Sequence, residues 1–317
     1  DRRLGLSGGM EPGRDYQYMR SAPFERLNLY AKIFRPPSVK FRELQAIVSS
    51  RYSANLVPFQ VRTDFVKITE ETILTPITIQ VKNRDLQFEE NNDVMQAKLS
   101  IYARLTTLSG RVAEVFEDAM QLDVPSRIFD KYADKNSVYQ KALPLRPGRY
   151  KLSIVLKDEN SENVGTLDLP VHVRRYDGES LASSSLILAT HMSPVPTSRV
   201  GSGTFVIGAT KVRPSVDRRF ARGADMGIYM QVYNLGLDEG SGKASAEIEF
   251  NVLSRGNKIL SFTENVPENY SSSRSQITVQ KSMPLNQLEP GKYTLQMKIT
   301  DKVKNQTLTP SENFEIY

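Results

Sequence analysis

The sequence contains no cysteine and only two histidines in 317 residues. These absences exclude a catalytic thiol, a disulfide framework and an iron–sulfur cluster, and they leave almost no way to build a zinc site. No stretch approaches the roughly 18 apolar residues of a membrane-spanning helix. Basic residues exceed acidic ones by 42 − 36 = 6, which is too few for a dedicated nucleic-acid binder. We therefore expect a chain without cofactor, metal, membrane span or nucleic-acid partner.

The remaining composition is that of an ordinary globular protein. Hydrophobic residues make up 39% of the chain, which is enough for packed cores, and about 150 residues per domain predicts two domains. The chain begins Asp1-Arg2-Arg3, without an initiator methionine or a targeting peptide. We expect that a leader was removed or that an upstream region is missing. The lack of cysteine favours export.

An internal repeat dominates the sequence. Residues Leu145–Asp158 and Leu288–Asp301 match at eight positions with a constant offset of 143, including a Pro-Gly pair, a tyrosine and the final aspartate. Other segments match in the same order: 77–83 with 228–234, 97–101 with 246–250, 140–145 with 280–285, and Phe59, Val61 and Val66 with Phe205, Ile207 and Val212. The offsets drift as loop insertions would make them drift. The sequence predicts two copies of one domain.

Within each copy, apolar residues alternate with polar ones at period 2. Residues 150–156 show this clearly, as do 75–81, 97–103, 248–253 and 276–279, and turns containing Pro and Gly bound the segments. This pattern is typical of half-buried strands in an antiparallel sandwich. The predicted fold is all-β, with two tandem, homologous, immunoglobulin- or fibronectin-like β-sandwiches. The predicted divisions are an arm with a short helix at 1–41, sandwich 1 at 42–176, a linker at 177–185 and sandwich 2 at 186–317.

Three local predictions concern the ends of these domains. Leu44–Val48 and Leu186–Ala189 are predicted as the first strands of the two copies, because both runs precede equivalent strands. Short helices are predicted at Phe24–Phe34 and Pro125–Tyr132, where apolar residues share one helical face. Residues 1–23 are expected to form an extended arm.

A search for catalytic chemistry finds no strong motif. His172 alternates onto the solvent face of a predicted strand, and His191 has no neighbouring metal ligand in the sequence. The acidic runs at 89–93 and 238–239 lack the spacing of a calcium loop, so solvated loops are the preferred interpretation. We find no phosphate-binding loop before a helix. The sequence therefore favours a protein that is not an enzyme.

Two surface features remain as candidates for ligand binding or an interface. The stretch 213–222 carries Arg213, Arg218, Arg219 and Arg222, which would suit either a polyanion-binding patch or a solvated loop. Tyr229 and Tyr233 lie on the strand face opposite Ile228, Met230 and Val232 by alternation. They are spaced to stack on a polymer, or to form a covered domain–domain interface.

Several blocks resemble the C-terminal region of the GWxTD-domain proteins, a family found mainly in acidobacterial genomes. The blocks are Phe24–Leu27, Arg35–Pro37, 46–50, Pro58–Phe65, Val138–Tyr150 and Ile228–Asn234. The Gly-Trp-x-Thr-Asp motif itself is absent, since the chain has no tryptophan. The resemblance implies the β-rich part of an exported protein, in the periplasm, at the cell surface or outside the cell, with the named domain upstream. It implies no activity and no site residues.

Two functional hypotheses follow. The first is a non-enzymatic structural or interaction protein of the cell envelope or exterior, which assembles into a homo-oligomer or filament, or with another envelope protein, through sheet edges and the arm. The alternative is a polymer- or glycan-binding accessory module of a larger protein, with a polysaccharide as ligand.

Overall fold

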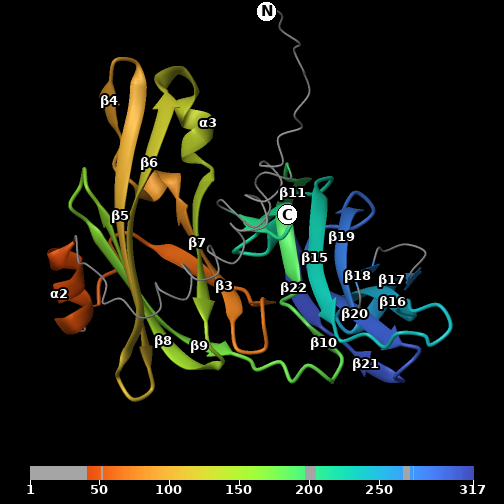
Figure 1. The fold of residues 1–317 in the computed structure, drawn as a ribbon. Coiled ribbons are helices and arrows are strands. Elements are labelled where there is room, and N and C mark those ends of the chain that lie inside the picture. The colour runs from red at the N-terminus through yellow and green to blue at the C-terminus, as the bar shows by residue number, and fades with distance from the viewer. Residues whose placement is uncertain (1–40, 51–52, 197–204, 267–271, 274) are drawn as a thin grey trace, which may run out of the picture.

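The protein consists of four β-sheets stacked face to face, two in each half of the chain (Figure 1). The computed structural model describes residues 41–50, 53–196, 205–266, 272–273 and 275–317. We name the sheets A to D in the order in which they stack. Sheets A and B enclose the core of domain 1, sheets C and D enclose that of domain 2, and the outer faces of B and C meet between the domains. The predicted all-β fold of tandem antiparallel sandwiches is confirmed.

The described residues of domain 1 form nine strands. Sheet B has β3 in its centre, with β1 and β2 on one side and β7 on the other. In sheet A, β5 lies between β6 and β8, and β9 follows β8. The bounds are β1 Phe59–Thr63, β2 Val66–Lys67, β3 Ile73–Lys82, β4 Glu89–Asn91, β5 Val94–Thr107, β6 Val112–Pro125, β7 Asn136–Leu145, β8 Gly148–Asp158 and β9 Val164–Val173.

Domain 2 repeats this plan with added edge strands. In sheet C, β15 lies between β19 and the pair β10 and β11; in sheet D, β20 and β16 are central. All pairings are antiparallel except that between β14 and β22. The bounds are β10 Ala182–Ser183, β11 Ile187–Pro194, β12 Val206–Ile207, β13 Thr210–Pro214, β14 Arg219–Phe220, β15 Asp225–Tyr233, β16 Ala246–Ser254, β17 Asn257–Val266, β18 Ser272–Ser273, β19 Gln276–Pro284, β20 Gly291–Asp301, β21 Gln306–Leu308 and β22 Ser311–Ile316.

The matching residues of the repeat have the same structural roles in both copies. Tyr150 and Tyr293 each donate a hydrogen bond from the hydroxyl to the carbonyl oxygen four residues earlier, at 2.9 and 2.6 Å, which closes the Pro-Gly turn. Asp158 and Asp301 are buried at the end of β8 and β20 and accept backbone N–H groups from the adjacent loops. These hydrogen bonds explain why a polar residue ends an otherwise apolar motif.

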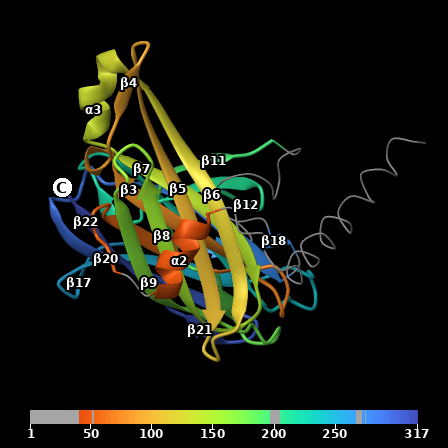
Figure 2. The same ribbon diagram turned by 90° about the vertical axis from the view of Figure 1, so that its left-hand side faces the viewer.

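One predicted first strand is wrong. Residues 44–48 belong to helix α2 (Arg42–Ser50), which lies on the outer face of sheet A (Figure 2). Leu44 packs against Tyr102 of β5 and Val155 of β8, with Ile47 and Val48 at the edge of the same cluster. The spacing i, i+3, i+4 is that of a helix face, and it outweighs the analogy with the second copy. The corresponding segment of the second copy does form a strand, since β11 begins at Ile187, but the short strand β10 precedes it in the same sheet.

The proposed match of Phe59, Val61 and Val66 with Phe205, Ile207 and Val212 is also wrong. β1 pairs directly with β3, whereas β12 and β13 are separated from β15 by β11. The strands that occupy the position of β1 beside β15 are β10 and β11. The hairpin of β12 and β13 is therefore an addition to domain 2. An apolar pattern alone cannot distinguish a central pairing from an added edge.

The remaining local predictions divide between the described residues and the rest. The helix predicted at Pro125–Tyr132 is confirmed as a 3-10 turn at Ser126–Ile128 that continues into α3 (Phe129–Ala133). A further 3-10 turn occupies Asn83–Asp85. The arm at 1–23 and the helix predicted at Phe24–Phe34 lie outside the described residues. In the predicted linker at 177–185, residues 182–183 form β10 and pair with β15.

Candidate functional site

Tyr229 and Tyr233 lie in the interface between the two domains. Their side chains alternate away from the core of domain 2, as predicted, but they are only 1% and 2% exposed. Tyr229 packs against Val66 of domain 1, and Tyr233 belongs to the core cluster of domain 1. Of the two interpretations of this tyrosine pair, the structure therefore agrees with the covered domain–domain interface and not with an exposed surface on which a polymer stacks. Domain 1 covers this face, and alternation along one strand carries no information about a second domain.

The tyrosine hydroxyls take part in a buried hydrogen-bond network. Tyr233 donates to Oε1 of Gln231 at 2.9 Å and accepts the backbone N–H of Lys67, in domain 1, at 3.0 Å. Gln231 donates from Nε2 to the Tyr229 hydroxyl at 2.8 Å. Burial raises the pKa of Tyr229 to about 12 and also raises that of Tyr233. The rings of Tyr233 and Tyr176 meet edge to face, with 5.4 Å between their centroids. Both hydroxyls therefore remain protonated, and that of Tyr233 forms a hydrogen bond across the domain boundary.

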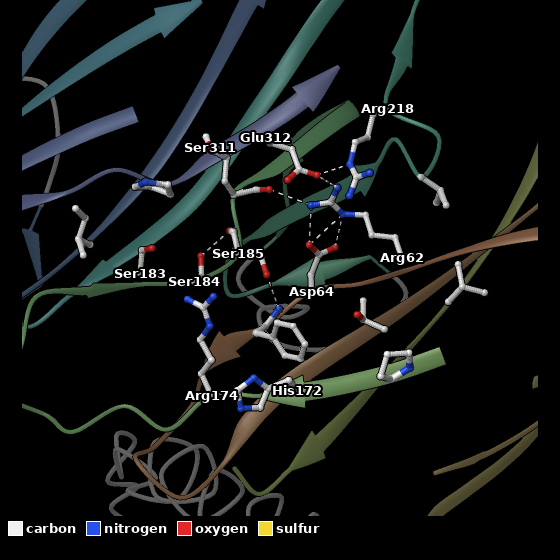
Figure 3. A pocket seen from close by; sticks show the side chains of 18 of the residues that line it. Arg62, Asp64, His172, Arg174, Ser183, Ser184, Ser185, Arg218, Ser311 and Glu312 are labelled. Carbon is white, nitrogen blue, oxygen red and sulfur yellow. Dashed lines mark hydrogen bonds and ion pairs between the residues drawn. The ribbon is translucent and has the colours of Figure 1, made fainter. Parts of the chain in front are cut away.

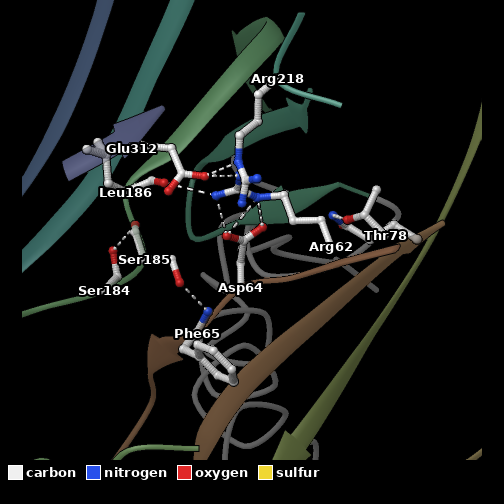
Figure 4. Close-up of polar contacts among 10 residues, drawn as sticks. Arg62, Asp64, Phe65, Thr78, Ser184, Ser185, Leu186, Arg218 and Glu312 are labelled. Atoms are coloured by element: carbon white, nitrogen blue, oxygen red, sulfur yellow. Dashed lines mark hydrogen bonds and ion pairs between the residues drawn. The ribbon is translucent and has the colours of Figure 1, made fainter. Parts of the chain in front are cut away.

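A cluster of four charged residues joins the domains beside this network, and we call it the Arg62 cluster: Arg62, Asp64, Arg218 and Glu312 (Figure 4). Arg62, from β1, contacts Asp64 through three N–H···O bonds of 2.8 to 3.0 Å. It also reaches domain 2, where it donates to Oε1 of Glu312 at 2.7 Å and to the carbonyl of Leu186 at 2.9 Å. Arg218 contacts the same oxygen of Glu312 from the rim.

The Arg62 cluster is electrically balanced, and its Arg62–Asp64 pair is buried, whereas Arg218 lies at the exposed rim. Arg62 and Asp64 are 7% and 1% exposed, and the two guanidinium groups match the two carboxylates in charge. Burial opposes the charge on Arg62, but the neighbouring carboxylates of Asp64 and Glu312 outweigh it and raise the pKa of Arg62 above its ordinary value. Such a cluster is stable only while all members stay together, because a lone buried charge is very unfavourable.

A groove of about 800 Å³ opens beside the Arg62 cluster, and we call it the serine groove (Figure 3). His172 and Arg174 lie on the side of domain 1, at the end of β9, and Ser183 to Ser185 lie on the side of domain 2. The serines already have structural contacts: the Ser185 hydroxyl accepts the N–H of Phe65 at 2.9 Å, and the Ser184 hydroxyl accepts the N–H of Gln231 at 2.8 Å. The groove is mainly a polar seam that holds the domains together.

A second hollow, of about 440 Å³, lies at another part of the boundary between the domains, and we call it the basic cleft. Lys82 and Arg84 come from the end of β3 and the following turn in domain 1. Arg213 and Arg219 come from β13 and β14 in domain 2. The four arginines of the basic stretch 213–222 are therefore divided. Arg213 and Arg219 line this cleft, whereas Arg218 belongs to the Arg62 cluster. Arg222 pairs with Glu289 at 2.8 Å.

The described residues contain no group of three or more His, Asp or Glu side chains placed to hold a metal ion. His172 is exposed beside Arg174, as its alternation predicted, and His191 lies on β11 opposite Arg213. The acidic run at 89–93 forms β4 and an exposed turn. No helix of the described chain is long and apolar enough to cross a membrane.

The residues that matter most at the interface were not among the candidates predicted from the sequence. Arg62 and Asp64 lie within the block 58–65, which was noted only for its resemblance to a family. The available signal was a pair of opposite charges two residues apart in a strand pattern, which places both on one face. Lys82 gave no signal, because its role depends on the position of domain 2.

Neither a protein-family model nor a curated protein matches the sequence. Among solved structures, β-glucuronidase from Bacteroides uniformis is 15% identical over 52% of this chain and 16% of that chain, with a TM-score of 0.27. Trypsin-activated alpha-2-macroglobulin from Escherichia coli is 10% identical over 84% and 17%, with a TM-score of 0.23. The C-terminal domain of the AgI/II polypeptide BspA from Streptococcus agalactiae is 7% identical over 82% and 99%, with a TM-score of 0.21. At these TM-scores we transfer no activity and no partner, and the resemblance to GWxTD-domain proteins stays a prediction.

Proposed function

We propose that this chain is a non-enzymatic structural or interaction module of the cell envelope or exterior, whose two sandwiches act as one stiff unit. The interface between the domains is the observation that supports this most. It combines an apolar cluster, the network of Tyr229 and Tyr233, and the Arg62 cluster. A hinge between independently moving domains would be expected to leave these groups in water. The location is proposed from the lack of cysteine and from the resemblance to an exported family.

We propose further that the module self-associates through a free strand edge. In the outer sheets, the long strands β6, β9 and β17 each pair with a single strand within the described chain, and residues 54–56 add backbone hydrogen bonds along the start of β9. β6 carries four acidic residues and no basic one, so that pairing with itself would place like charges together. β17 carries one lysine, one glutamate and an exposed Ile259. β17 is therefore the better edge for pairing with a second copy.

The experiment is the absolute mass by light scattering across a range of concentrations, against a monomer mass of 35.8 kDa. We expect a mass that rises with concentration, or a discrete oligomer. Ile259→Lys with Thr263→Lys places charge on the free edge of β17 and should return the mass to that of the monomer. Gln296→Lys with Thr300→Lys is the matched control, because β20 has neighbours on both sides. A monomer at every concentration would end the proposal of self-association.

The arm at residues 1–23 has a part in the same proposal. A chain that begins at residue 24 should form smaller oligomers if the arm contacts a neighbouring subunit, and an unchanged mass would remove the arm from the assembly. The alternative function, binding of a polysaccharide, loses the tyrosine surface on which it was based. The basic cleft is now the observation that favours it.

A further inference from the structure

The basic cleft differs from the serine groove in how its charges are balanced. Four of its lining side chains are cationic (Lys82, Arg84, Arg213 and Arg219) and two are acidic (Asp134 and Asp217). In the serine groove, Arg62 and Arg218 share the carboxylates of Asp64 and Glu312, and only Arg174 has no carboxylate partner in the described chain. The lining side chains therefore carry a net charge of 4 − 2 = +2 in the basic cleft, against 3 − 2 = +1 in the serine groove.

Two of the four cations in the cleft have no carboxylate partner in the part of the chain that the structure describes. Arg84 pairs with Asp134, and Arg219 lies 3.8 Å from Glu315. Asp217 is already engaged, because it accepts hydrogen bonds from Gln80 at 3.1 Å and from Ser215 at 3.1 Å. No ion pair involves Lys82 or Arg213 there, and these two residues approach the cleft from different domains.

We propose that the basic cleft binds an acidic polysaccharide, a chain of sugars that bear carboxylate groups. The carboxylates would pair with the guanidinium group of Arg213, which binds a carboxylate through two parallel hydrogen bonds, and with the ammonium group of Lys82, which acts as a point charge. Asn136 and Thr190 line the same cleft and offer an amide and a hydroxyl of the kind that binds sugar hydroxyls. The ligand would bridge the two domains. All four cationic side chains of the cleft are exposed, which suits a passing polymer chain better than an enclosed small molecule.

The same lining argues against nucleic acid as the ligand. Proteins that bind single strands stack bases on free aromatic faces. Tyr317 is the only aromatic side chain that lines the cleft in the described chain, and Arg219 already lies over its ring at 4.9 Å. An acidic peptide presents carboxylates without the accompanying hydroxyls, and it is treated below as an outcome of the test.

The test uses the full chain and three probes: polygalacturonate, the same polymer with its carboxylates methyl-esterified, and poly-L-glutamate. Binding is measured by titration calorimetry at low salt and again at high salt. We expect polygalacturonate to bind and salt to weaken it, because the contacts are exposed charge pairs. The esterified polymer should not bind, and poly-L-glutamate should bind more weakly. Lys82→Ala and Arg213→Ala should each weaken binding about fivefold, which is the loss of one charged contact.

Arg222→Ala and Lys98→Ala are the matched controls. Arg222→Ala removes one positive charge from the same arginine stretch, and Lys98→Ala removes one from an exposed site of domain 1. Neither residue lines the cleft. All four substituted side chains are exposed, so the variants should keep the unfolding midpoint of the parent chain. Absence of binding to polygalacturonate, equal losses in the controls, or equal binding of the esterified polymer would overturn the proposal. Tighter binding of poly-L-glutamate would overturn the choice of polysaccharide. None of these results depends on self-association, which the mass measurement tests separately.

Discussion

Replacing Arg62 by methionine should destabilise the interface between the two domains. Methionine keeps much of the length of the side chain but removes every hydrogen bond to Asp64, to Glu312 and to the carbonyl of Leu186. Glu312 still has Arg218 as a partner. Asp64 has no other ion pair in the described chain and is 1% exposed, so its carboxylate would remain buried and uncompensated.

The expected loss in the free energy of unfolding comes from Asp64, which loses its ion pair, and not from Glu312, which keeps Arg218. Breaking a buried ion pair by removing one partner costs about 3–5 kcal/mol, because the remaining charge keeps its desolvation penalty. Arg218→Met is the matched control, since it removes an arginine from the same oxygen of Glu312. Arg218 is 47% exposed, so we expect a loss of about 0–1 kcal/mol. Arg62→Met combined with Asp64→Leu should recover most of the loss, because no unpaired charge is left.

The assay is urea unfolding followed by far-ultraviolet circular dichroism. We expect the parent chain to unfold in one cooperative transition and Arg62→Met to unfold at lower urea, in two steps if the domains come apart first. The reasoning would be refuted if Arg62→Met were no more destabilising than Arg218→Met. It would also be refuted if the double variant were as unstable as Arg62→Met alone.

Three further predictions follow from single side chains. Burial raises the pKa of Tyr229 from 10 to about 12. Between these pH values the tyrosine ionises in the unfolded chain but not in the folded one, so the free energy of unfolding falls as pH rises. Tyr229→Phe should remove up to about 3 kcal/mol of this fall, measured by urea unfolding at a series of pH values. Asp301→Ala leaves the N–H groups of Gly236, Val303 and Lys304 without their carboxylate and should cost about 2–3 kcal/mol by the same assay, whereas an equal effect of Asp238→Ala, in an exposed loop, would contradict this. Tyr293→Phe removes only the hydroxyl that closes the Pro-Gly turn and should cost about 1 kcal/mol in urea unfolding, with no loss if the turn holds by itself.

The strands of both sandwiches could be predicted because their physical cause is local. Alternation at period 2 identified the segments that became β3, β5, β8, β16 and β19. The repeat then assigned them to two equivalent domains. The prediction failed at residues 44–48, because the apolar residues of so short a segment are compatible with both a helix and a strand. The outcome there depended on the outer face of sheet A, which offered Tyr102 and Val155 as packing partners.

The polar contacts across the interface could not be predicted, because the residues that meet in them lie far apart in the sequence. Arg62 and Glu312 are 250 residues apart, and their meeting depends on how the outer faces of sheets B and C pack. The same packing decides which candidate residues are accessible. Tyr229 and Tyr233 become buried, whereas Arg213 and Arg219 come to share a cleft with Lys82. Composition and periodicity describe each domain by itself and leave this arrangement open.

The claim that the two sandwiches form one stiff unit is tested most directly by a distance between them. The chain has no cysteine, so Lys98→Cys and Lys298→Cys introduce two unique labelling sites, on the exposed outer faces of β5 and β20. The two faces are separated by three sheet-to-sheet spacings of about 10 Å each, which gives a distance of about 30 Å. This distance suits double electron–electron resonance between spin labels. We predict a single narrow distance distribution that broadens in Arg62→Met. A broad or two-peaked distribution in the parent chain would contradict a stiff unit.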